Sequence, residues 1–394
     1  MQATQHLHNH IKKVCQAIDP RRLRAVFAAV ESLSYTGRLT LTGLGRSLRS
    51  RAEVKHNIKR MDRLLGNERM YKQLAPIYGA VAQYILSSSQ NPIIVVDWTE
   101  LSWDGSYQLL RAAVPVDGRA LSIYEEVHPL SKLNNARVHR RFLMKLKKLL
   151  GDSCCPIVVT DAGFKTPWFK TVEKMGWHWV GRVRSRTMFQ GSEQEPWIHC
   201  KSLYEKASCR SRHLGRVNLT RSRPLHCYLY LIKNKKRGRV KRTVHGNRCR
   251  SHHSNKNAAR QNEPWLLASS LDVPAKKLIK IYRKRMQIEE NFRDMKNTRW
   301  GFCLRETRTK NAHRLSILVL IGTLAHLAIW LIGRAGQRKN LHFKFQANTV
   351  RDHKVLSTPF LGSQILLNGK FPIRAPDIRH AKRELNSIVG QEAA

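Results

Sequence analysis

Three acidic residues in this chain occupy positions that suit metal-dependent chemistry. Asp97 and Asp161 each follow a short run rich in Val and Ile, so each is expected to end a buried strand. Adjacent strands would hold both carboxylates at one edge of a sheet, and Glu289 would face them from a helix. Three hard oxygen ligands suit Mg²⁺ or Mn²⁺ rather than zinc, and two such ions suit attack on a phosphodiester.

The stretch 280–296 predicts one continuous helix, because it contains no Gly or Pro and Pro274 upstream suits a first helical turn. At 3.6 residues per turn, one face of this helix would carry Tyr282, Arg285, Glu289, Arg293 and Lys296. Cations that flank an acidic side chain keep it ionised and can also bind an anionic ligand. A solvated face with i,i+4 ion pairs would give the same pattern.

The charge balance points to a polyanionic partner. The 394 residues include 72 Lys and Arg against 27 Asp and Glu, a net charge of +45. Nucleic acid is the usual partner of such a surface, although a basic ribosomal or packaging protein would show the same balance. The length predicts two or three domains.

Neither secretion nor a membrane is indicated. The 8 cysteines form no pair of C-x-x-C motifs, which favours free thiols in a reducing compartment. The N-terminus has no apolar stretch of the kind found in signal peptides. Residues 315–332 are almost wholly apolar and could pass for a membrane span, but a helix buried behind a sheet is the preferred interpretation.

Residues 1–90 are expected to form a helical DNA-binding domain. Within it, 40–66 predicts two short helices across a tight turn, the first capped by Thr40 and the second ended by Gly66. The second helix is rich in basic and polar residues, as in a helix-turn-helix that reads the major groove. Its candidate DNA contacts are His56, Lys59 and Arg60.

From Pro92 onward the pattern predicts three meandering strands, a helix, a strand, a helix and a strand. This is the order of a ribonuclease H-like core, in which the first and fourth strands are neighbours. The predicted fold is therefore α/β, with the catalytic domain formed by 91–185 and 264–335. A basic, β-rich insertion occupies 186–263, and a helical C-terminal region for DNA contact or dimerisation occupies 336–394.

One cluster in the insertion has roughly zinc-like spacing: His245, Cys249, His252 and His253. It lies in a basic stretch without an apolar frame, which argues against a zinc site.

The motifs around the acidic residues resemble those of a known family. They are Val-Val-Asp97-Trp-Thr, Val-Thr-Asp161-Ala-Gly-Phe, and Tyr282-x2-Arg285-x3-Glu289-x6-Lys296. The chain resembles bacterial DDE transposases of the insertion-sequence-four family, most closely the branch of transposon Tn-ten. The last motif matches that family's Tyr-Arg-Glu-Lys signature at full spacing, and the likeness covers about residues 40 to 365.

The resemblance implies that Asp97, Asp161 and Glu289 bind two Mg²⁺ ions, for which Mn²⁺ can substitute. It implies that Tyr282, Arg285 and Lys296 hold phosphates of the DNA end, and that Trp265 receives a base turned out of the stack. Such enzymes nick a transposon end, form and reopen a hairpin, and join the end to target DNA. They act as a homodimer on double-stranded DNA in the bacterial cytoplasm, close to the nucleoid. The alternative for Trp265 is a core tryptophan on a strand.

Two other functions fit parts of the pattern. A non-catalytic basic DNA-binding or regulatory protein would need no acidic triad, yet all three carboxylates are present. A metal-dependent nuclease would share the core but would not transfer strands; the signature helix and Trp265 argue against it. The sequence names neither the end sequence that is bound nor the target preference.

Overall fold

The structure is a computed structural model that describes residues 1–87, 89–184, 187–234, 247, 249, 251, 263–299 and 301–393. The chain forms two compact units. The first comprises Met1–Pro156 and Met286–Ala394, and the second comprises Ile157–Arg285. Both units combine helices with strands, which confirms the predicted mixed α/β class. The ribonuclease H-like core and the proposed domain boundaries stay predictions.

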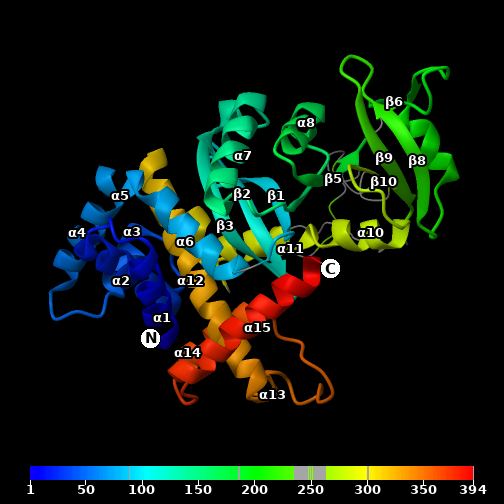
Figure 1. Ribbon diagram of the computed structural model, residues 1–394. Helices are drawn as coiled ribbons and strands as arrows, with labels where there is room; N and C mark the ends of the chain where they lie inside the picture. Colours follow the sequence, from blue (N-terminus) through cyan, green and yellow to red (C-terminus); the bar gives the residue numbers. More distant parts are fainter. Residues whose placement is uncertain are drawn as a thin grey trace. The chain divides into compact units, whose positions relative to one another are not determined.

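The first unit contains three antiparallel strands in the order β3-β2-β1, surrounded by helices (Figure 1). The strands are β1 (Ile93–Glu100), β2 (Tyr107–Val116) and β3 (Arg119–Pro129). The helices are α1 (Gln2–Val14), α2 (Pro20–Thr36), α3 (Leu41–Arg46), α4 (Val54–Leu65), α5 (Glu68–Lys72), α6 (Leu74–Leu86), α7 (Ala136–Leu150), α11 (Met286–Lys296), α12 (Ala312–Arg338), α13 (His342–Phe345), α14 (Thr358–Asn368) and α15 (Ala375–Ala393). Short 3-10 turns lie at η1 (Leu130–Lys132) and η3 (Leu304–Glu306).

The second unit is built on strands in the order β4-β5-β10-β9-β8-β6-β7. Strands β4 and β5 are parallel, and the remaining neighbours are antiparallel. The strands are β4 (Ile157–Thr160), β5 (His178–Val183), β6 (Met188–Gln190), β7 (Ile198–His199), β8 (Arg212–Leu219), β9 (Leu225–Ile232) and β10 (Trp265–Ser269). Helices α8 (Thr166–Lys174) and α10 (Ala275–Arg283) and the 3-10 turn η2 (Cys200–Lys206) complete it.

The predicted order of elements after Pro92 is confirmed: β1, β2 and β3 are followed by α7, β4, α8 and β5. The turn between β2 and β3 places Asp117 and Gly118 at positive φ, 43° and 86°, which fits a tight hairpin. The predicted neighbouring of the first and fourth strands involves both units and stays a prediction.

The predicted pair of short helices near the N-terminus is confirmed as α3 and α4. Thr40 caps α3, because its side-chain oxygen accepts a hydrogen bond from the Gly43 amide. The two helices cross closely at Gly45, where an added Cβ would lie 2.6 Å from the Ile58 Cα. The glycine is therefore required by the helix crossing.

Helix α12 is the apolar helix expected from the sequence, and it is a core helix of the first unit. Its length and composition would allow it to span a membrane, but 94% of its most apolar stretch is buried. It packs against α2, α14, α15 and β3 (Figure 1). The prediction of a buried helix is confirmed.

The prediction of one continuous helix over 280–296 is wrong. Helix α10 ends at Arg283, the chain turns at Lys284 and Arg285, and α11 begins at Met286. The amides of Lys284 and Arg285 bond carbonyls three residues back, which tightens the last turn of α10. No residue here breaks a helix by itself. The two halves instead pack on different strands, α10 on β5 and β9 and α11 on β1, β2 and β3.

All eight cysteines are free thiols, as expected. Of the zinc-like cluster, only Cys249 belongs to the described residues; His245, His252 and His253 lie outside them, as do Lys235–Arg237 of the basic stretch.

Candidate active site in two halves

Asp97 lies inside a strand rather than at its end, which corrects the sequence prediction. Strand β1 continues to Glu100 because β2 pairs with it along its whole second half, and Asp97 lies opposite Arg111 in this register. Asp97 is half-buried, and its Oδ1 accepts a hydrogen bond from the Trp98 amide at 2.8 Å. The backbone thereby fixes the orientation of this carboxylate.

Lys296, in the last turn of α11, lies beside the same strand. Its Nζ donates to Oγ1 of Thr99, two residues beyond Asp97. Burial, together with the nearby Arg305 and Arg111, lowers the pKa of Lys296 to about 8, although Glu100 and Asp97 act in the opposite direction. A cation whose charge is not fully compensated therefore lies next to the carboxylate of Asp97.

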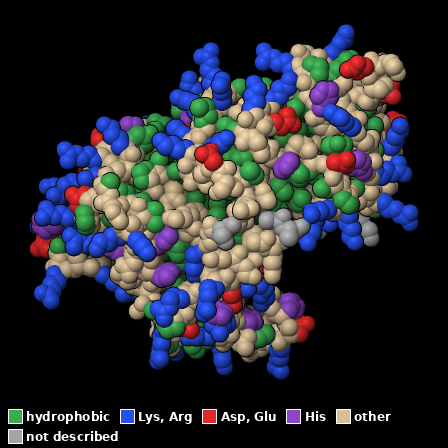
Figure 2. Space-filling view, in the orientation of Figure 1, with side chains coloured by type: hydrophobic (Ala, Val, Ile, Leu, Met, Phe, Trp, Pro, Cys, Tyr) green, Lys and Arg blue, Asp and Glu red, His purple; other side chains and the backbone are tan. Residues whose placement is uncertain are grey.

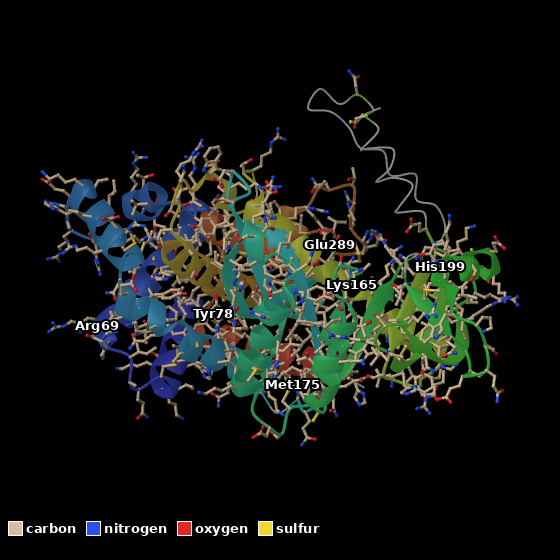
Figure 3. All side chains as sticks on the ribbon, turned by 90° about the horizontal axis from the view of Figure 1, so that it is seen from above. Arg69, Tyr78, Lys165, Met175, His199 and Glu289 are labelled. Atoms are coloured by element: carbon tan, nitrogen blue, oxygen red, sulfur yellow. The ribbon has the colours of Figure 1, made fainter. Side chains whose placement is uncertain are left out.

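Glu289 lies in the first turn of α11, where the helix dipole favours a negative charge (Figure 3). It is half-buried, while Ile288, Phe292 and Met295 form the buried face of the helix. Helix α11 packs against β1, so the first unit brings the helix of Glu289 to the strand of Asp97. Lys296 follows Glu289 by two turns on the same side of the helix.

Arg293, expected on the face of Glu289, follows it by about one turn of α11 and makes a surface ion pair. Its Nη1 lies 2.8 Å from Oε2 of Glu290, and the Arg293 side chain is 63% exposed. Glu290 also lies 4.0 Å from Arg119 of β3. Such exposed pairs contribute about 0–1 kcal/mol to stability.

Asp161 follows β4 directly, as predicted, and opens the loop to α8. Its Oδ1 accepts a hydrogen bond from the Gly163 amide at 2.7 Å, which closes a turn typical of Asp. Lys165, labelled in Figure 3, lies further along this loop. Its Nζ donates to the Ala162 carbonyl at 2.8 Å. Asp161 therefore has a fixed position at the end of a buried strand.

Tyr282 is the centre of a second group of predicted site residues. It is only 3% exposed, and its ring meets that of Trp265 edge to face at 5.1 Å. The Arg285 guanidinium lies 5.9 Å from the same ring. Burial raises the pKa of Tyr282; Arg285 and Arg182 counteract this, and Asp161 adds to it.

In the second unit, Trp265 and Arg285 thus lie around the phenol of Tyr282, which also interacts electrostatically with Asp161. Trp265 is half-exposed, so part of its indole remains open to a ligand.

Arg182 on β5 belongs to this group, although the sequence analysis missed it. Its side chain is 12% exposed, and its contacts are weak: Glu263 at 3.9 Å and the Pro264 carbonyl at 3.4 Å. Its Nε has no hydrogen-bond partner among the residues that the structure describes. A buried guanidinium of this kind suits an anionic ligand. The only sequence signal was a cation within an otherwise apolar strand.

The carboxylates suit a hard cation. Asp97, Asp161 and Glu289 offer only oxygen donors, which Mg²⁺ and Mn²⁺ prefer. Over the described parts of the chain, no group of three or more His, Cys, Asp or Glu side chains forms a metal-binding cluster. Of the three predicted ligands, Asp97 and Glu289 belong to the first unit and Asp161 belongs to the second.

The predicted DNA contacts of α4 are all exposed. His56, Lys59 and Arg60 project from α4, whose opposite face buries Met61 and Leu64. Asn57, between them, is buried instead and bonds Ser50 and the Ala52 carbonyl, so it holds the turn. Lys and Arg side chains project from many parts of the visible face, whereas acidic side chains are sparse there (Figure 2).

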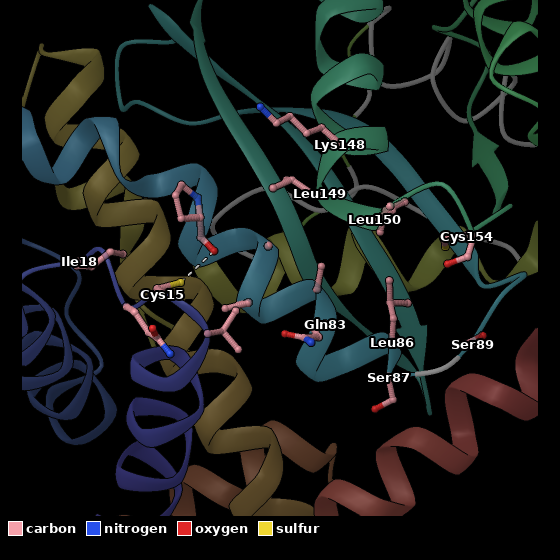
Figure 4. Close-up of a pocket in the computed structure, with 18 of the residues that line it drawn as sticks. Cys15, Ile18, Gln83, Leu86, Ser87, Ser89, Lys148, Leu149, Leu150 and Cys154 are labelled. Atoms are coloured by element: carbon pink, nitrogen blue, oxygen red, sulfur yellow. Dashed lines mark hydrogen bonds between the residues drawn. The ribbon is translucent and has the colours of Figure 1, made fainter.

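A cavity of about 850 Å³ in the first unit does not coincide with these residues. It is lined by the α1–α2 loop, α6, and the end of α7 with the loop after it (Figure 4). Cys15 borders it and donates to the Pro76 carbonyl at 3.3 Å, and burial raises the pKa of its thiol. Among the described residues, its lining contains no Asp, Glu or His, and Lys148 is its single cation, so it lacks the acidic ligands of the predicted site.

Comparison with known proteins agrees with the chemistry of these residues. The family model described as "Transposase DDE domain" matches residues 88–327, more than half of the chain, and this range includes all three carboxylates. No curated protein matches the chain. The family match implies an enzyme of DNA transposition, and such enzymes generally use divalent metal ions. The chain therefore belongs to the family of transposases with a DDE domain.

Proposed function

We propose that this protein is a cut-and-paste DNA transposase that binds the terminal repeats of its element, cleaves there, and joins the 3′ ends to target DNA. The observation that carries the proposal is the arrangement in the first unit: α11 packs on the strand of Asp97 and carries both Glu289 and Lys296, whose pKa is lowered to about 8. A regulator that only binds DNA has no use for two carboxylates and a half-buried ammonium on adjoining elements.

Asp97, Asp161 and Glu289 together hold the metal ions in this proposal, two Mg²⁺ per site with Mn²⁺ as a substitute. The bound ions supply an activated oxygen nucleophile and stabilise the leaving oxygen of the phosphodiester. The protein positions the carboxylates: backbone amides orient Asp97 and Asp161, and the first turn of α11 orients Glu289.

The cationic side chains hold the DNA end. Lys296 and Arg285 bind phosphates beside the cut, with Tyr282 supporting Arg285 through its ring. Trp265 receives a base turned out of the stack, which stabilises a hairpin intermediate. Its half-exposed indole, supported at one edge by Tyr282, suits such a platform. Arg293 adds a contact only if DNA displaces Glu290.

Within the DDE transposases, the proposal assigns this chain to the insertion-sequence-four family and its Tn-ten branch, because of the spacing of Tyr282, Arg285, Glu289 and Lys296. The protein acts as a homodimer on two paired ends in the bacterial cytoplasm. Helix α4 reads the terminal repeat through His56, Lys59 and Arg60, which are exposed together. The ribonuclease H-like arrangement of the core is part of the same proposal.

The test is Mg²⁺-dependent cleavage of a labelled duplex that carries the element's own end, analysed on a denaturing gel. Glu289→Ala is compared with Glu290→Ala, a matched control that removes the neighbouring carboxylate. We expect a nick and then a hairpin-length product from the unaltered protein and the control, and neither from Glu289→Ala.

Two other results would replace the proposal. Cleavage without a hairpin would indicate a metal-dependent nuclease, and salt-sensitive binding without cleavage would indicate a non-catalytic DNA-binding protein.

A further inference from the structure

The outer face of α7 is a continuous cationic stripe that none of the proposed roles uses. Its exposed residues recur at intervals of three and four, so they share one side of the helix. They are Arg137, Arg140, Arg141, Met144, Lys145 and Lys148. At 1.5 Å per residue, the stripe is about 16 Å long.

This stripe has almost no acidic counterpart. The sequence contains no Asp or Glu between Glu126 and Asp152. Only Lys145 is paired, with Glu126 at 2.7 Å. Arg137, Arg140, Arg141 and Lys148 make no ion pair with any residue that the structure describes. Like charges at i,i+3 and i,i+4 destabilise a helix by a few tenths of a kcal/mol per pair, so a polyanionic partner would relieve this repulsion.

The inner face of α7 contacts both the strand of Asp97 and β3. Nε1 of Trp98, the residue after Asp97, donates to Nε2 of His139 at 2.8 Å. Burial lowers the pKa of His139 to about 4, so its imidazole stays neutral and can accept this bond. Phe142 packs on Tyr124 with ring centroids 5.0 Å apart. A ligand on the outer face would thus be held at a fixed place relative to Asp97.

The surface of α7 also has a shallow depression with room for part of a sugar-phosphate backbone. A depression of about 780 Å³ lies along the first half of α7 and includes Lys132 from the preceding turn. The first amides of the helix are already satisfied, since Asn135 accepts from Arg137 N and Val138 N. Recognition here therefore rests on the side-chain cations.

We propose that the outer face of α7 binds the sugar-phosphate backbone of the target DNA duplex, through Arg137, Arg140, Arg141 and Lys148. This inference rests on the proposed function. The face presents Arg, Lys and Met but no Asn, Gln, Asp or Glu, so it lacks the side chains that read adenine and cytosine, while its row of cations suits phosphates. A terminal repeat has one sequence, whereas a target varies, and only the backbone is common to all targets.

The test compares the triple variant Arg137→Gln/Arg140→Gln/Arg141→Gln with Arg210→Gln/Arg221→Gln/Arg223→Gln. The second set removes the same charge from exposed arginines just before β8 and in the β8–β9 turn. In the binding arm, a fluorescent duplex of unrelated sequence is titrated into the complex of protein and end DNA, at several salt concentrations. In the reaction arm, pre-cleaved ends are joined to a plasmid.

We expect the α7 variant to bind the unrelated duplex at least about tenfold more weakly than the control, and to join ends to the plasmid correspondingly less. Each lost phosphate contact reduces the salt slope by about 0.9, so three contacts reduce it by up to about 2.7. Cleavage of the end duplex should remain within about twofold of the control, and thermal unfolding should be unchanged.

Equal binding of the second duplex by both variants would overturn the inference. So would an equal loss of end binding and target binding in the α7 variant, because α7 would then hold the end. If the unaltered protein binds the second duplex through α7 but joins nothing to it, the proposed function fails while the DNA-binding role of α7 stands.

Discussion

A fully buried ion pair behind the strand of Asp97 gives the sharpest prediction. Arg111 and Glu125 lie 2.5 Å apart, with side chains 0% and 1% exposed. Glu125 also accepts hydrogen bonds from the hydroxyls of Tyr78 and Thr323. Replacing Arg111 with Met would leave Glu125 charged and buried without its cation, which typically costs about 3–5 kcal/mol.

The guanidinium of Arg111 also reaches the helix of Glu289. It donates to Asn291 Oδ1 and to Met295 Sδ, both on α11, and lies 4.7 Å from the Phe292 ring. The pair therefore links β2, opposite Asp97, with α11. Its loss should loosen α11 as well as lower stability.

The assay is urea unfolding of the unaltered protein, Arg111→Met, Glu125→Leu and the double variant, followed by circular dichroism. The double variant removes both charges but leaves the Tyr78 and Thr323 hydroxyls without their acceptor and Asn291 Oδ1 without its Arg111 donor, at about 1–3 kcal/mol for each buried group. Because no buried charge is left unpaired, it should cost less than the two single variants added together, with a coupling of about 2 kcal/mol or more.

Arg119→Met is the matched control, since its ion pair with Asp294 at 2.7 Å is partly exposed and should contribute only about 0–1 kcal/mol. An Arg111→Met cost no larger than this control would refute the reasoning. Strictly additive single and double costs would refute it as well. Cleavage by the double variant should fall even where its stability recovers, because α11 has lost its link to β2.

Three further predictions concern the site and the DNA-reading helices. End binding should weaken as pH rises through about 8, because the lowered pKa of Lys296 lets the free protein lose the proton that phosphate binding requires; Lys296→Arg should keep binding to higher pH, and identical titration curves would contradict this. Trp265→Ala should still nick the end but accumulate less hairpin on the gel; unchanged hairpin yield would make Trp265 a core residue. Gly45→Ala should destabilise the protein by about 1–3 kcal/mol in urea and weaken specific end binding, since its Cβ would clash with the Ile58 backbone; an unchanged midpoint would show that α3 and α4 can move apart.

Local features of the sequence were sufficient for many elements. The Val and Ile runs before Asp97 and Asp161 predicted β1 and β4, since such runs need burial on both faces. Thr40 and Gly66 marked the start of α3 and the end of α4, because caps satisfy backbone groups within a few residues.

The break between α10 and α11 could not be predicted in this way. Lys284 and Arg285 are good helix formers, and the two apolar stripes are in phase along the sequence. Tertiary packing separates them, since each stripe buries itself on different strands. The residues expected on one helix face therefore belong to different elements. Tyr282 lies in α10 and Arg285 in the turn after it, whereas Glu289 and Lys296 lie in α11.

The sequence by itself determined the partner class, the candidate carboxylates and most of the elements that carry them, because charge, residue type and periodicity are local properties. Only the tertiary structure decided that Asp97 lies within β1, that Lys296 reaches Thr99, and that Arg111 is buried against Glu125. Each of these depends on contacts between residues far apart in the chain. Such contacts form where burial and hydrogen bonding of whole elements favour them, and no local pattern encodes that choice.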